Sequence, residues 1–203
     1  GDSTTFGLGP YEYPRALESA LAAHGKPAEV INGGVEGYVA RNILLEMDRY
    51  LAVKPDIVTL MIGWNSIFSD IPWSDSWEVR VRFFWLVKKA WGVLRSRSDL
   101  HSRAVSSFQK PLRAIQDSPE VTGLENYILR EAGRIETIID NLLSSGATVV
   151  LLTLPGLFTL DESPSQRALT IGHLPEFTDN VYVLAKLTDR VNLWIRRVAE
   201  RRK

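Results

Sequence analysis

The sequence contains no cysteine, three histidines and no long apolar run, and each shortage excludes something. Without cysteine, a disulfide scaffold, a thiolate metal site and thiol catalysis are excluded. No stretch reaches the ~18 apolar residues of a membrane span. The 24 basic residues balance the 24 acidic ones, so net charge gives no reason to expect a nucleic-acid partner. No metal-ligand spacing and no phosphate-binding loop occurs, so neither a metal nor another cofactor is expected.

Apolar runs of strand length alternate with segments of helical periodicity along the 203 residues. The alternation predicts an α/β fold with a parallel sheet, in which ligands bind beyond the carboxyl ends of the strands. Strands are predicted near Ala28–Ile31, Asp56–Ile62 and Ala147–Leu154. Helices are predicted over about Tyr13–His24, Val39–Leu51, Leu124–Leu143 and Val181–Arg201.

Three short strings carry residues suited to ester chemistry. The first, Gly1-Asp2-Ser3, suits a tight turn that exposes a serine hydroxyl. The second is Asn32-Gly33-Gly34-Val35-Glu36-Gly37, and the third, Gly63-Trp64-Asn65-Ser66, follows a predicted strand. A serine hydroxyl needs a base and anion-stabilising donors to act as a nucleophile. Each string also has a plain structural interpretation, as a turn serine, a turn glycine or a loop-capping asparagine.

In this order and spacing the strings resemble the blocks of the GDSL, or SGNH, hydrolase family of esterases, lipases, acetylhydrolases and related acyltransferases. The resemblance also includes Tyr13-Pro14, Lys54-Pro55-Asp56 and Thr153-Leu154-Pro155, and covers most of the chain apart from residues near 70–125. It implies a three-layer α/β/α sandwich of flavodoxin-like type, whose five parallel strands lie in the order 2-1-3-4-5. A helical insertion would follow the third block.

The resemblance also assigns roles. Ser3 would be the nucleophile that forms an acyl-enzyme. The Gly37 N–H, the Asn65 side-chain amide and the Ser3 N–H would stabilise the oxyanion. Asp2 would brace the serine turn by accepting backbone N–H bonds, and Asp2 and Trp64 are the candidates on the substrate-binding side. The expected partner is a small-molecule, glycan or lipid ester. The expected function is therefore that of a serine hydrolase that acts on ester bonds.

Two features depart from the family pattern. Ser66 stands where the family usually has Asp. The block Asp-x-x-His, which carries the general base, is absent: neither His24, His101 nor His173 has Asp three residues before it. His173 could be recruited as a base only if it lay within reach of the hydroxyl. The string Asp189-Arg190-Val191-Asn192 has the spacing with Asn in place of His, and its place in a predicted helix favours a structural role.

These departures leave alternatives open. The chain is predicted to be a single domain, 1–203, truncated at both ends, and inactive as given. An O-acyltransferase on a glycan and a non-catalytic binding domain remain alternatives. The absent first strand would leave the slot between Ala28–Ile31 and Asp56–Ile62 empty or filled by something foreign, so that the chain should be unfolded or aggregation-prone.

The stretch 70–125 differs in composition from the rest. Five of the six tryptophans lie between Trp64 and Trp91, and nine basic residues accompany two acidic ones from Trp77 to Arg113. An insertion packed on the sheet domain is the plainest interpretation. A lid over the site and a surface that contacts anionic membrane are the alternatives. The compartment is not determined by the sequence.

Overall fold

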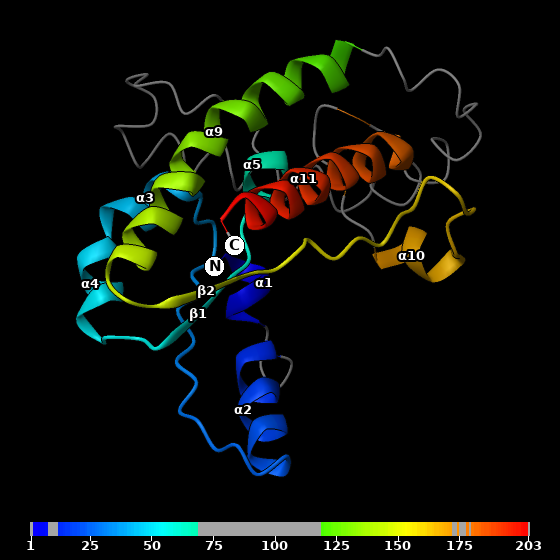
Figure 1. The fold of residues 1–203 in the computed structure, drawn as a ribbon. Coiled ribbons are helices and arrows are strands. Elements are labelled where there is room, and N and C mark those ends of the chain that lie inside the picture. The colour runs from blue at the N-terminus through cyan, green and yellow to red at the C-terminus, as the bar shows by residue number, and fades with distance from the viewer. Residues whose placement is uncertain are drawn as a thin grey trace, which may run out of the picture. The chain divides into compact units, whose positions relative to one another are not determined.

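The computed structural model describes residues 2–7, 12–68, 119–171, 174, 178 and 180–202; Figure 1 shows their elements. The predicted insertion, 70–125, lies outside the described residues except for its last seven positions, which belong to α9 (Pro119–Ser144). The chain divides into two compact units. The first comprises Gly1–Ser66, Ile128–Leu154 and Val191–Lys203, and the second comprises Ile67–Tyr127 and Pro155–Arg190.

The first unit contains a parallel sheet of two strands, β1 (Ile57–Leu60) and β2 (Thr148–Leu151). Ile57 lies opposite Thr148 and Leu60 opposite Leu151, and backbone bonds extend the ladder by one residue at each end. Both strands lie inside the apolar runs that predicted them. A parallel sheet is therefore confirmed, and the family's α/β architecture is compatible with it.

The prediction of a strand at Ala28–Ile31 is wrong, because this segment is a connection that pairs with no strand in the described part of the chain. In particular, its backbone does not pair with β1. A cavity of about 720 Å³ has both segments in its lining, together with α2 (Tyr13–Ala23). Ile31 and Ile57 are 61% and 63% exposed. An apolar run becomes a strand only when a neighbour accepts its backbone hydrogen bonds.

Three helices between residues 13 and 52 precede β1 in the sequence. α2 ends where Gly25 takes a φ of 70°, and the Lys26 N–H returns to the Leu21 carbonyl, as the glycine signal predicted. The single helix predicted over Val39–Leu51 is instead two helices, α3 (Ala40–Leu45) and α4 (Met47–Ala52). Glu46 separates them with φ −103° and ψ 11°, outside helical geometry.

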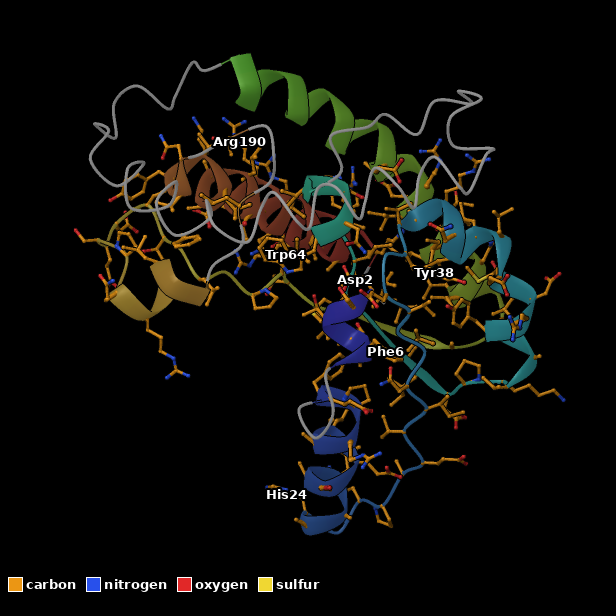
Figure 2. All side chains as sticks on the ribbon, turned by 180° about the vertical axis from the view of Figure 1, so that it is seen from behind. Asp2, Phe6, His24, Tyr38, Trp64 and Arg190 are labelled. Carbon is orange, nitrogen blue, oxygen red and sulfur yellow. The ribbon has the colours of Figure 1, made fainter. Side chains whose placement is uncertain are left out.

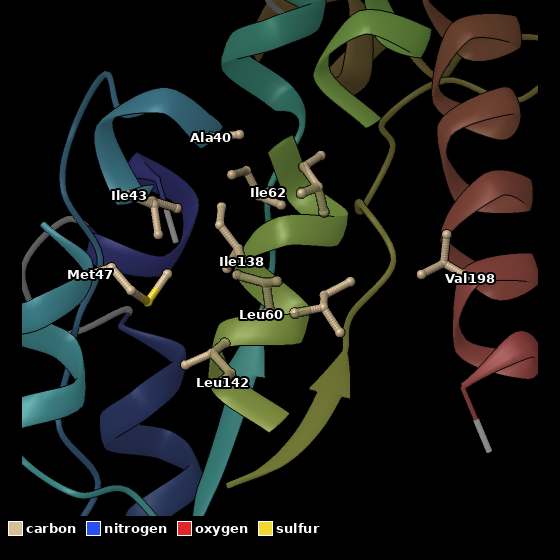
Figure 3. Packing of buried hydrophobic residues seen from close by; sticks show 10 residues of the cluster. Ala40, Ile43, Met47, Leu60, Ile62, Ile138, Leu142 and Val198 are labelled. Carbon is tan, nitrogen blue, oxygen red and sulfur yellow. The ribbon is translucent and has the colours of Figure 1, made fainter. Parts of the chain in front are cut away.

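The core of the first unit lies where α3 and α4 face α9 and β1 (Figure 3). Ile138 of α9 is completely buried, and it packs with apolar side chains from the other three elements. Burial of one such side chain contributes about 1.5–3 kcal/mol. The labelled members in Figure 3 are Ala40, Ile43, Met47, Leu60, Ile62, Ile138, Leu142 and Val198.

The second unit holds α10 (Gln166–Ile171) and the first half of α11 (Val181–Arg201). α11 coincides with the predicted helix. The Asn180 side chain caps it by accepting the Tyr182 N–H at 3.0 Å, and Thr178 accepts the Asn180 N–H. Among the helices that the structure describes, none is both long enough and apolar enough to cross a membrane.

Candidate active site

Ser3 opens a one-turn helix, α1 (Ser3–Phe6), and its side chain is exposed. Asp2 caps this turn: its Oδ1 accepts the Thr4 N–H at 3.0 Å, and its carbonyl accepts the N–H groups of Thr5 and Phe6. Asp2 is completely buried. The predicted brace is therefore confirmed, and it leaves the Ser3 hydroxyl on the surface of the turn.

The second string is in direct contact with the serine turn. Asn32 donates through Nδ2 to the Phe6 carbonyl and to Glu12 Oε2, each at 3.0 Å, and its Oδ1 accepts the Gly34 N–H at 3.0 Å. A Cβ at Gly34 would lie 2.3 Å from the Phe6 nitrogen. Only glycine allows so close an approach of two backbones. Asn32 and Gly34 together thus join the first two strings.

The third string is bonded to the residue that directly follows the second string. Asn65 follows β1 at the start of α5 (Trp64–Phe68), as predicted, and its Nδ2 donates to the Tyr38 carbonyl at 2.8 Å. Tyr38 directly follows Gly37, which has a φ of 77° and an exposed backbone. A Cβ at Gly37 would meet nothing within 4 Å. The space next to the Gly37 Cα is therefore open, and the second Nδ2 hydrogen of Asn65 is not needed for the Tyr38 bond.

Figure 2 labels Asp2 at the start of α1, together with Tyr38 and Trp64. Trp64 is half-buried. His24 lies instead at the end of α2 away from α1, and its Nδ1 contacts the Ala20 carbonyl at 2.8 Å. His101 and His173 lie outside the described residues. In the described ranges, no group of three or more His, Asp and Glu side chains could hold a metal ion.

Asn192 occupies the position at which the spacing from Asp189 would require a histidine, and its contacts are structural. Its Oδ1 accepts the Leu154 N–H at 2.7 Å and its Nδ2 donates to the Leu154 carbonyl at 3.0 Å. These two bonds satisfy the backbone N–H and C=O groups of Leu154, which follows the end of β2. The structural role predicted for this string is confirmed.

Tyr50 of α4 borders the second string, and its hydroxyl lies 3.4 Å from the Gly33 carbonyl. Burial of the ring raises the pKa of Tyr50 above its usual value of 10, and the neighbouring Tyr38 and Glu46 add to the effect. The phenol is therefore neutral throughout the physiological pH range, and it acts at the second string as a hydrogen-bond donor.

Sequence reasoning missed two side chains that hold this arrangement together. Asn32 was recognised only as the first letter of a string, although its amide makes three hydrogen bonds: to the Phe6 carbonyl in the serine turn, to Glu12, and to Gly34 within the second string. Glu12 was not singled out; it accepts from Asn32 and lies against Gly7, where a Cβ would be 2.7 Å from Glu12 Cγ. An asparagine directly before Gly33-Gly34 was the only available signal, since a side chain's distant partner is not encoded locally.

The whole chain, residues 1–203, matches the model of the GDSL-like Lipase/Acylhydrolase family. No curated protein and no solved structure gives a significant match.

Proposed function

The chain belongs to the GDSL-like lipase/acylhydrolase family, and from this premise we propose that it is a serine hydrolase that acts on ester bonds through Ser3. Ser3 attacks the acyl carbonyl, and the Gly37 N–H, the Asn65 amide and the Ser3 N–H stabilise the oxyanion. The substrate in this proposal is an ester of a small molecule, a glycan or a lipid, and water accepts the acyl group from the acyl-enzyme.

The observation that carries the proposal is the chain of contacts from one string to the next. Gly34 and Asn32 contact the turn that bears Ser3, and Asn65 bonds the residue after Gly37. These contacts support the proposal that a nucleophile and oxyanion donors from three distant parts of the sequence act together. Each oxyanion donor of this kind contributes about 3–4 kcal/mol to transition-state stability.

The three-layer sandwich that the resemblance implies is part of the same proposal. In it, the two strands of the described sheet belong to a larger parallel sheet. Asn65 follows the carboxyl end of β1, the edge at which ligands bind in such sheets.

The proposed mechanism requires a base for the Ser3 proton. His24, the histidine of the described part of the chain, contacts Ala20 at the far end of α2 and does not serve this role in the proposal. In subtilisin, loss of the histidine base alone lowers kcat about 2 × 10⁶-fold. We therefore expect the 203-residue chain to hydrolyse p-nitrophenyl acetate poorly and free imidazole to raise the rate by acting as a diffusible base.

The test combines this assay with a fluorophosphonate probe and peptide mapping of the adduct. We expect a slow adduct on Ser3, accelerated by imidazole and absent from Ser3→Ala. Ser19→Ala is the matched control, because the Ser19 hydroxyl only bonds the Arg15 carbonyl on the exposed side of α2. An adduct on another residue contradicts the assignment of the nucleophile, and so does imidazole-stimulated turnover that survives Ser3→Ala and exceeds the rate with imidazole alone. Release of the acyl group to a sugar in preference to water would identify a transferase.

A further inference from the structure

Glu12 joins the beginning of α2 to the serine turn. It is the residue directly before α2, yet its side chain makes no capping bond to that helix. Its Oε2 instead accepts from Asn32 Nδ2 at 3.0 Å, and the same Nδ2 donates to the Phe6 carbonyl at 3.0 Å. The half-buried carboxylate of Glu12 therefore bonds the second string and not its own helix.

The contacts of the Asn32 amide fix its direction. An asparagine side chain has two N–H hydrogens and one carbonyl oxygen. The hydrogens serve Phe6 and Glu12, and Oδ1 accepts the Gly34 N–H at 3.0 Å. A reversed amide would point its oxygen at two acceptors. Because a carboxylate only accepts hydrogen bonds, Glu12 holds the NH₂ group of Asn32 toward the serine turn.

Glu12 also packs directly on the residue that ends the serine turn. Gly7 has a φ of 76°, and its N–H donates to the Ser3 carbonyl at 2.9 Å. A Cβ at Gly7 would lie 2.7 Å from Glu12 Cγ and 2.8 Å from Glu12 Cα. Only glycine leaves room for this approach. Glu12 thus contacts a residue that is itself bonded to Ser3.

The start of α2 is anchored to the sheet beside Glu12. The hydroxyl of Tyr13 lies 2.9 Å from Thr59 Oγ1 in β1. Pro14 is buried in the first turn of α2, where its missing N–H is not needed. In Figure 2 the Phe6 end of α1 lies toward α2. Contacts therefore run from β1 through the start of α2 to the end of the serine turn.

We propose that Glu12 is a positioning residue for Ser3. Its contacts with Asn32 and Gly7 form a clamp that keeps the serine turn in one orientation relative to the second string. Glu12 lies at the Gly7 end of the turn, whereas Ser3 opens it, so Glu12 takes no part as a base in this proposal. The effect of the clamp on the reactivity of Ser3 rests on the proposed function, but the clamp itself does not.

The first test compares the rates at which variants of the full chain are labelled by the fluorophosphonate at Ser3. Glu12→Leu keeps a stem that packs on Gly7 and removes the acceptor. We expect it to slow labelling at least about tenfold, because a misplacement of about 1 Å can lower a rate about 100-fold. Glu12→Asp keeps the charge but withdraws the carboxylate by one methylene, and it should be slowed similarly. Glu12→Gln keeps an acceptor and should react within about threefold of wild type, since a neutral acceptor makes a weaker bond.

The second test measures the clamp without the chemistry of Ser3. We expect Glu12→Leu and Glu12→Asp to shift the NMR signals of the Asn32 side-chain NH₂ group, and Glu12→Gln to leave them close to those of wild type. The matched control is Glu18→Leu, the same change at an exposed position of α2. It should alter neither the Asn32 signals nor the labelling rate.

A double variant adds a third test. Asn32→Ala already removes the bond that Glu12→Leu breaks. The double variant should therefore be labelled as fast as the slower single variant, within about twofold.

The proposal is wrong if a folded Glu12→Leu or Glu12→Asp variant labels Ser3 at the wild-type rate, or if Glu12→Gln is as slow as Glu12→Leu. It is also wrong if the Asn32 signals do not respond to Glu12→Leu, or if the effects of Glu12→Leu and Asn32→Ala multiply. Failure of wild-type Ser3 to react would instead contradict the proposed function, and the Asn32 signals would still decide whether the clamp exists. The two proposals can therefore fail separately.

Discussion

Substitution of Gly34 by alanine should separate the serine turn from the second string. The added Cβ would lie 2.3 Å from the Phe6 nitrogen and 2.8 Å from both Phe6 Cα and the Thr5 carbonyl carbon. All three are backbone atoms, so no side chain can rotate away. Gly34 is not among the glycines with positive φ, so backbone strain plays no part and the effect is steric.

The magnitude follows from the required displacement. Non-bonded heavy atoms prefer separations of about 3.5–4.0 Å, so the turn must move by about 1 Å. Overpacking of a tight site costs about 1–3 kcal/mol, and we expect Gly34→Ala near the upper end. For a chain of this length, 3 kcal/mol corresponds to a fall in Tm of about 6–12 °C. The displaced turn should also lower the rate of fluorophosphonate addition to Ser3.

The assay is urea unfolding together with adduct formation, and Gly133→Ala is the control. Gly133 lies in α9, where a Cβ would meet nothing within 4 Å. The same substitution should therefore stabilise the protein there, by about 1 kcal/mol, through helix propensity alone. If Gly34→Ala is as stable as wild type and labels Ser3 at an unchanged rate, the two strings are not packed as described.

Four other predictions concern single features. Asn192→Asp should cost about 2–3 kcal/mol in urea unfolding, because a carboxylate cannot donate to the Leu154 carbonyl that Asn192 Nδ2 bonds at 3.0 Å; equal stability would contradict this. Gly37→Ala should lower the free energy of unfolding by about 1–2 kcal/mol because of its φ of 77° alone, since a Cβ there would meet nothing within 4 Å. A larger loss of stability would show that a neighbouring group contacts the added methyl group. The pKa of Tyr50 is raised in the folded state, so the free energy of unfolding should fall as pH rises from about 10 through the folded pKa. Tyr50→Phe should remove that part of the fall in unfolding curves measured at alkaline pH. An unchanged curve would show that Tyr50 is not its source. The 203-residue chain should bind the dye ANS and associate in sedimentation experiments, because a cavity of about 720 Å³ borders β1; a monomer that melts cooperatively and leaves the dye unbound would contradict this.

Several elements could be predicted from the sequence because their signals are local. The helix at 181–201 has apolar residues at helical spacing, and α2 is followed by Gly25 and Pro27, which end a helix by backbone geometry. The runs that became β1 and β2 are continuous and apolar, as buried parallel strands are. The order of the three strings was also enough to identify the family, which the full-length match shows.

Tertiary structure alone decided how those elements meet. The run Ala28–Ile31 has strand composition, yet it pairs with neither of the strands that the structure describes, because a strand depends on a neighbour that local sequence does not specify. Asn192 matched a catalytic spacing but serves the backbone of Leu154, 38 residues away. Glu12 carries no periodic or motif signal of its own, and the string that contains Asn32 does not reveal the partners of its amide. Their roles arise from contacts between segments distant in the sequence, and only the folded chain brings those segments together.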